Sequence, residues 1–141
     1  MATFLLKTEP GDYSYADLVK DKKTTWTGVK NAAALGHLRT VRKGDELFIY
    51  HTGDEKAIVG LAQAASDAFE DPKQPGKTPD GKPKFAVIDL KPLRAAKSPV
   101  TLSQIKADKR FKDFELVTIG RLSVMPVPPE IDKPLRALAG L

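Results

Sequence analysis

The stretch of this sequence that says most about the fold is KGDELFIYHTG, at residues 43–53. It opens with Lys43-Gly44-Asp45, a composition typical of a turn. The next six residues, Glu46–His51, are rich in aromatic and β-branched side chains, which predicts a strand. A second turn begins at Thr52-Gly53, and Ala57–Ala65 then predicts the following strand. This stretch therefore predicts two strands joined by a turn.

Further strands are predicted on both sides of this pair from apolar runs that end at turn residues. They are Phe4–Leu6, Phe85–Leu90 with Leu93 continuing past Pro92, and Leu122–Val127, with Trp26–Val29 extended or irregular. Short helices are predicted between them from capping patterns. They run from Ser14 through Val19, over Asn31–Arg39, from the capping box Thr101–Gln104, and over Ile131–Ala139, where Gly140 ends the chain's last helix.

Strands dominate this pattern, and no regular β-α-β alternation argues for a doubly wound parallel sheet. A mixed, partly closed barrel with helices plugging its ends fits better, so the predicted fold class is α+β. Residues 71–83 hold four prolines and two glycines, which predicts a long loop rather than a domain boundary. With this length, residues 1–141 are expected to form a single domain.

The composition excludes several kinds of site. The chain has no cysteine, which removes disulfides and thiolate chemistry, and its two histidines, His37 and His51, predict no metal site. No apolar run is long enough to span a bilayer, and the short apolar start does not resemble a leader, so a cytoplasmic monomer without cofactor is expected.

Charge is distributed unevenly along the chain. The net charge of +5 divides into −1 over residues 1–70 and +6 over residues 71–141. A basic excess on one half suits contact with phosphates, although a solvated lysine-rich surface explains the same pattern.

Four segments also carry a resemblance to a known family: Phe4–Pro10, Trp26–Asn31, Lys43–Gly53 and Arg121–Val127. Together, in this order, they resemble the EVE family of PUA-like domains over nearly the whole chain. The resemblance implies a PUA-like pseudo-barrel related to YTH domains, which hold a methylated adenine in an aromatic cage. It further implies a binding partner in DNA or RNA that carries a modified base, and separately encoded effector proteins.

The chain departs from the family pattern at four positions. The family often has tryptophan where Phe4 stands and usually an aromatic residue where Ala32 stands. It often has arginine and asparagine where Leu35 and Gly36 stand. These differences lie beside the expected pocket and therefore concern the ligand more than the fold.

A nucleobase needs aromatic walls for its flat faces and a few donors and acceptors for its edge. The predicted base pocket comprises Trp26, Val29, Asn31, Tyr50, His51, Thr52, Leu122 and Ser123. The predicted charged rim comprises Lys7, Glu9, Lys30, Arg39 and Arg121. Plainer interpretations stay open for several of these residues: Trp26 as a core residue, Asn31 as a helix N-cap, and the charged groups as solvated surface.

Two other functions compete with a base reader. A serine hydrolase would need Ser123, His51 and a carboxylate, but no Gly-x-Ser-x-Gly elbow is present. A zinc deaminase would need cysteine ligands, so we predict a binding module and not an enzyme. An RNA-binding module that reads backbone and shape, with a degenerate pocket, stays the alternative, and Ala32 favours it.

Overall fold

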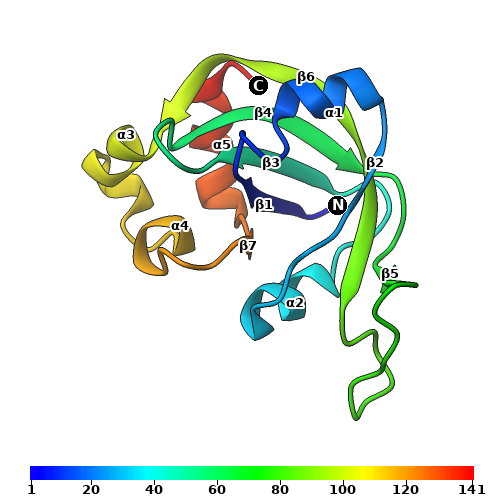
Figure 1. The fold of residues 1–141 in the computed structure, drawn as a ribbon. Helices are drawn as coiled ribbons and strands as arrows, with labels where there is room; N and C mark the ends of the chain where they lie inside the picture. The colour runs from blue at the N-terminus through cyan, green and yellow to red at the C-terminus, as the bar shows by residue number, and fades with distance from the viewer.

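The computed structural model describes residues 1–141 and shows an α+β fold built on one seven-stranded sheet. Six strands are adjacent in the order β2-β6-β4-β3-β1-β7, and β5 pairs separately with β6. The strands are β1 (Thr3–Thr8), β2 (Thr24–Trp26), β3 (Glu46–His51), β4 (Ala57–Ala64), β5 (Phe69–Glu70), β6 (Ala86–Thr101) and β7 (Val124–Pro126). The sheet curls into a half-barrel with short helices around it, as the sequence predicts (Figure 1).

The two strands predicted from residues 46–65, β3 and β4, lie in the middle of the sheet. They pair antiparallel across the turn that begins at Thr52, and all the residues from Leu47 to His51 are buried. On its other side β3 runs parallel to β1, which in turn pairs antiparallel with β7. A parallel neighbour requires a long crossover, and residues 9–45 supply it through α1, β2 and α2.

The 16-residue strand β6 gives the sheet its curl. Its first part pairs with β5 and β2, and the rest pairs with β4. Two irregularities interrupt the β4–β6 register, and such bulges bend a strand and increase its twist. β2 lies at one end of the strand order, where it pairs with the first part of β6. Its last residue, Trp26, lies opposite Ile88.

The helices begin where the predicted caps stand. The capping boxes at Ser14 and Thr101 start α1 (Tyr15–Asp21) and α3 (Leu102–Ala107), and the Asn31 side chain caps α2 (Ala32–Leu38). The last helix, α5 (Pro129–Ala139), ends at Gly140 in the left-handed region, with φ 70°. Two further helical segments were not predicted: η1 (Lys109–Phe111) and α4 (Glu115–Thr118). None of these helices is both long and apolar enough to cross a membrane.

The core lies between the sheet and these helices. A cluster of 32 buried residues links β1, β3, β4 and β6 to all five α-helices. Phe48 of β3 and Phe111 and Phe114 of the unpredicted helical region are its largest fully buried side chains. Residues 71–83 form the predicted loop, which projects from the body of the molecule (Figure 1).

Candidate functional site

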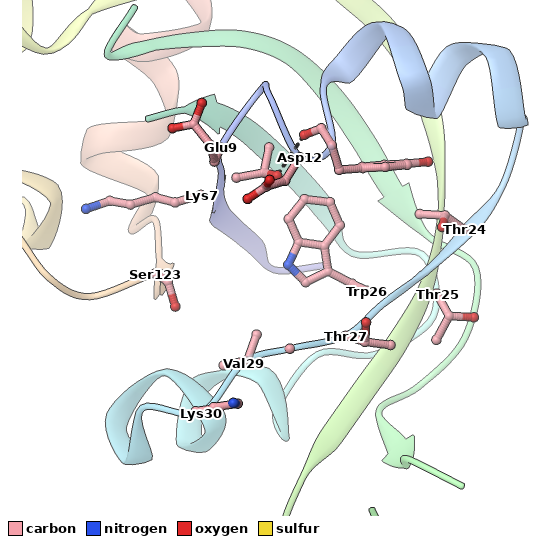
Figure 2. A pocket seen from close by; sticks show the side chains of 13 residues that line it. Lys7, Glu9, Asp12, Thr24, Thr25, Trp26, Thr27, Val29, Lys30 and Ser123 are labelled. Carbon is pink, nitrogen blue, oxygen red and sulfur yellow. Dashed lines mark hydrogen bonds between the residues drawn. The ribbon is translucent and has the colours of Figure 1, made fainter. Parts of the chain in front are cut away.

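An open cleft of about 460 Å³ lies where β1 ends beside β2. Its volume falls in the range of ligand pockets, roughly 300–1,000 Å³. We call it the tryptophan cleft (Figure 2). Its lining consists of Lys7, Thr8, Glu9, Asp12, Tyr13, Thr24, Thr25, Trp26, Thr27, Gly28, Val29, Lys30 and Ser123.

Trp26 forms one wall of this cleft and also belongs to the hydrophobic core. Only 9% of the residue is exposed, yet it lines the cleft, and its indole nitrogen points toward Lys7 and Ser123 (Figure 2). The Tyr13 ring packs edge-on against the indole, with ring centroids 6.4 Å apart and planes at 84°. Such edge-to-face pairs are favourable. Trp26 is therefore a core residue that also lines the cleft.

Lys7 and Ser123 lie together on the side of the cleft opposite β2. The backbone N–H of Lys7 donates to the Ser123 carbonyl at 2.9 Å, which joins the two segments. The Lys7 ammonium donates to the Gly120 carbonyl at 2.9 Å and stands 5.7 Å from the centre of the Tyr50 ring. Burial of this half-buried side chain lowers the pKa of the Lys7 ammonium. The Ser123 hydroxyl has no bond to the protein and is free to bind a ligand.

Two carboxylates border the cleft near the indole. Glu9 is held in place: its carboxylate accepts from the Gly11 N–H at 3.2 Å and from the Thr52 hydroxyl at 3.2 Å. Asp12 is exposed, and its carboxylate lies beside the indole without a side-chain partner (Figure 2). This pair places hydrogen-bond acceptors at the cleft, and Lys30 adds a donor to its lining.

Sequence reasoning missed several lining residues, notably Asp12, Tyr13 and the threonines at 8, 24, 25 and 27. A signal for the first two existed: they follow the Pro10-Gly11 turn directly after the strand that carries Lys7 and Glu9. A chain that turns back at that point stays beside the strand end. The backbone of Gly28, two residues after Trp26, has φ 82°, in the left-handed region that favours glycine.

The tryptophan cleft gathers only part of the predicted set: Trp26, Val29 and Ser123 from the pocket, and Lys7, Glu9 and Lys30 from the rim. Asn31 lies outside it, because its side chain accepts from the Ala34 N–H at 3.0 Å as the N-cap of α2. Asn31 is therefore a helix N-cap in this structure, which is the plainer of its two interpretations.

The β3 residues also differ from the pocket prediction. Tyr50 and His51 are both buried. The β3–β4 register shifts between Ile49 and Tyr50, and such a bulge changes the direction of the side chains that follow it. Tyr50 and Thr52 face a different cleft, on the far side of Lys7. Leu122 is buried in the core beneath Ser123, where its apolar side chain is expected.

Two predicted rim arginines lie elsewhere. Arg39 is directed to the end of the loop at residues 71–83, where its guanidinium donates to the Pro83 and Lys84 carbonyls at 2.6 and 2.9 Å. It therefore anchors that loop instead of bordering the cleft. Arg121 is exposed beside Ser123 but does not line the cleft.

His51 has a structural position that a sequence pattern could not reveal. Its Nε2 accepts from the Tyr15 N–H at 3.0 Å, and its Nδ1 lies 2.7 Å from the Glu55 carboxylate. With both ring nitrogens engaged, this imidazole is not placed to act as a base on Ser123.

We therefore expect His51→Ala to lower the free energy of unfolding by about 1–3 kcal/mol, because the buried Tyr15 N–H loses its acceptor. Urea denaturation measures this change. Ligand binding by the folded variant should stay near that of the wild type, since His51 lies outside the tryptophan cleft. An unchanged stability would contradict the role assigned to this side chain.

The family model of the EVE domain matches residues 2–137. This chain belongs to the EVE domain family. The sequence resemblance and the PUA-like α+β fold are thereby confirmed. A curated relative is human thymocyte nuclear protein 1. The two sequences are 30% identical in an alignment 155 positions long, which covers 90% of this chain and 69% of that protein.

Solved structures resemble this EVE domain closely. A protein from Rhodopseudomonas palustris, solved by NMR, is 37% identical with a TM-score of 0.89, covering 99% of this chain and 94% of that one. The crystal structure of the human THYN1 protein in complex with 5-methylcytosine containing DNA is 27% identical with a TM-score of 0.87. That match covers 100% of this chain and 99% of the human chain.

Proposed function

We propose that this EVE domain is a non-enzymatic module that binds one modified nucleobase in DNA, with 5-methylcytosine as the first candidate, in the tryptophan cleft. The observation that carries the proposal is the indole of Trp26, which lines a cleft of about 460 Å³ together with hydrogen-bond donors and acceptors. The human relative crystallised with 5-methylcytosine containing DNA supports the class of ligand.

The chemistry of the cleft suits a base with an exocyclic amine. Cytosine presents its N4 amine as a donor, and carboxylates of aspartate or glutamate accept from it. Asp12 and Glu9 supply such acceptors, while Ser123 is free to donate or accept. Thymine presents an acceptor at the same position and would meet like polarity there. The acidic side of the cleft therefore favours cytosine over thymine.

A methyl group on the base requires an apolar surface away from these polar groups. Val29 and the indole of Trp26 offer apolar surface in the cleft. One added methyl group in an apolar niche is worth roughly 1–3 kcal/mol, so preference for the methylated base should be modest. A base in a duplex must also leave the stack to enter such a cleft, at a few kcal/mol.

A binding panel at one salt concentration tests the proposal. Matched duplexes carry cytosine, 5-methylcytosine or thymine at one position, and fluorescence anisotropy measures each Kd. We expect 5-methylcytosine to bind roughly tenfold tighter than cytosine, and thymine to bind weakest. Affinity should fall for all duplexes as salt rises, because phosphate contacts release counterions. The methyl preference should persist, and recovered DNA should have unchanged mass.

The alternative function is a reader of RNA backbone and shape with a degenerate pocket. The exposed Ala32 and the placement of Asn31, Tyr50 and His51 outside the cleft favour it. Under this alternative, RNA of matched sequence binds tighter than DNA, the steep salt dependence stays, and all three bases bind equally. Equal affinities in the panel would therefore contradict the base-reading proposal and support this one.

A further inference from the structure

A second cleft, of about 280 Å³, lies on the other side of the Lys7 side chain. We call it the lysine cleft. It is lined by Lys7, Tyr50, Thr52, Gly53, Lys56, Leu102, Lys106, Leu116, Val117 and Gly120. The base-binding proposal uses only one residue of this set, Lys7, which lines both clefts. The two clefts are therefore neighbours that share a wall.

Three lysines line the lysine cleft without an anionic partner. Lys7, Lys56 and Lys106 form no ion pair within 4.0 Å, unlike Lys77, which lies 2.9 Å from Glu70. The nearby acids are directed elsewhere: Glu55 contacts His51 Nδ1, and Glu9 contacts the Thr52 hydroxyl. Like charges brought together without compensation favour a bound anion.

The backbone at Lys56 is also unusual. Its φ is 45°, in the left-handed region, which costs about 1–3 kcal/mol for a residue other than glycine. The other non-glycine residue with positive φ, Lys22, has an ordinary explanation as the C-cap of α1. Lys56 likewise ends a turn, the one between β3 and β4, where hairpin loops commonly use the left-handed conformation, and it lines the lysine cleft.

Part of the lysine cleft is apolar. Leu102, Leu116 and Val117 contribute apolar side chains to its lining. A free inorganic anion has no apolar surface that could pack against these side chains. The sugar of a nucleotide does, because it has carbon faces beside the charged phosphate. The combination of apolar wall, hydroxyl and ammonium groups therefore matches a sugar–phosphate unit.

We propose that the lysine cleft binds the backbone phosphodiester adjoining the nucleotide whose base occupies the tryptophan cleft, with Lys56 and Lys106 as its cationic ligands. Lys7, half-buried between the clefts and fixed by the Gly120 carbonyl, separates base from phosphate. This inference rests on the proposed function, because the base in the first cleft determines which phosphate reaches the second.

Neutral linkages in the DNA test the proposal. A duplex with one 5-methylcytosine carries a methylphosphonate linkage directly 5′ of that base, directly 3′ of it, or remote from it. We expect one adjoining linkage to weaken binding roughly tenfold more than the remote one, since a charge-assisted contact is lost. The same loss at all three positions would overturn the proposal.

A double variant assigns the lost contact to the cleft. Lys56→Gln with Lys106→Gln should bind the natural duplex roughly tenfold more weakly, and the adjoining neutral linkage should then have no further effect. Lys91→Gln with Lys133→Gln removes the same charge from exposed lysines outside both clefts and should keep the full linkage effect. A linkage effect undiminished in the cleft variant would contradict the assignment.

The methyl preference separates this inference from the base-reading proposal. The lysine-cleft variant should still prefer 5-methylcytosine over cytosine, because the tryptophan cleft is intact. A wild-type protein that lacks methyl preference but shows the position-specific linkage effect would contradict the base-reading proposal and support the phosphate site. Methyl preference without any linkage effect would contradict the phosphate site alone.

Discussion

Trp26→Ala is expected to abolish the preference of this EVE domain for 5-methylcytosine and to weaken binding of the methylated duplex by about one to two orders of magnitude. Stacking of a base on an aromatic side chain is worth roughly 1–3 kcal/mol, and Trp26 is the single tryptophan of the chain. The Kd values for methylated and unmethylated duplexes, measured at one salt concentration, give the result. They should become equal in the variant.

This substitution also removes a large buried side chain. Trp26 is 9% exposed and packs against Tyr13 and the core, so alanine is expected to reduce stability by about 3–5 kcal/mol. Two further variants separate loss of fold from loss of binding. Trp26→Phe keeps an aromatic face and should retain part of the preference, whereas Trp26→Leu keeps apolar bulk without the ring.

A melting curve for each variant establishes that the protein is folded at the binding temperature. A folded Trp26→Leu variant with wild-type methyl preference would contradict the stacking role of the indole. Loss of preference in that variant, together with partial retention in Trp26→Phe, assigns the effect to the aromatic ring rather than to the volume of the side chain.

Gly60→Ala is expected to lower the free energy of unfolding by about 1–3 kcal/mol, because the core has no space for the added methyl group. A Cβ at this position would lie 2.5 Å from two ring atoms of Tyr15. That ring cannot move freely: its hydroxyl donates to the Leu61 carbonyl at 2.8 Å, and the Tyr15 N–H donates to His51. Urea denaturation measures the change.

Gly36→Ala is the matched control, because it adds the same methyl group in open space. No atom lies within 4 Å of a Cβ at Gly36, which is inside α2. Alanine loses less conformational freedom than glycine in a helix, so this variant should be more stable by roughly 0.5–1 kcal/mol. Equal effects of the two substitutions would contradict the close contact between Gly60 and Tyr15.

The elements that were predicted correctly are those whose signals are local. The turn at Lys43-Gly44-Asp45, the buried strand after it and the capping boxes at Ser14 and Thr101 all depend on neighbouring residues. The late strand was predicted over Leu122–Val127 but has only three residues in β7. Of its outer residues, Leu122 and Val127 belong to the core, and single backbone hydrogen bonds join Ser123 and Val127 to β1.

The elements that were missed depend on distant partners. The strand predicted over Phe85–Leu90, with Leu93 past Pro92, continues in β6 through Pro99 to Thr101, because β4 pairs along that length. The helical segments η1 and α4 are too short to show a helical period, and they owe their place to Phe111 and Phe114 in the core.

By itself the sequence determined the α+β class and the family, because composition, caps and ordered motifs are properties of the chain. Only the tertiary structure decided that Asp12 and Tyr13 line one cleft with Trp26, Lys7 and Ser123, and that Tyr50 and His51 do not. The parallel β1–β3 pairing and the bend of β6 decide which side chains meet. Such proximity comes from contacts between residues far apart in the chain, which no local pattern encodes.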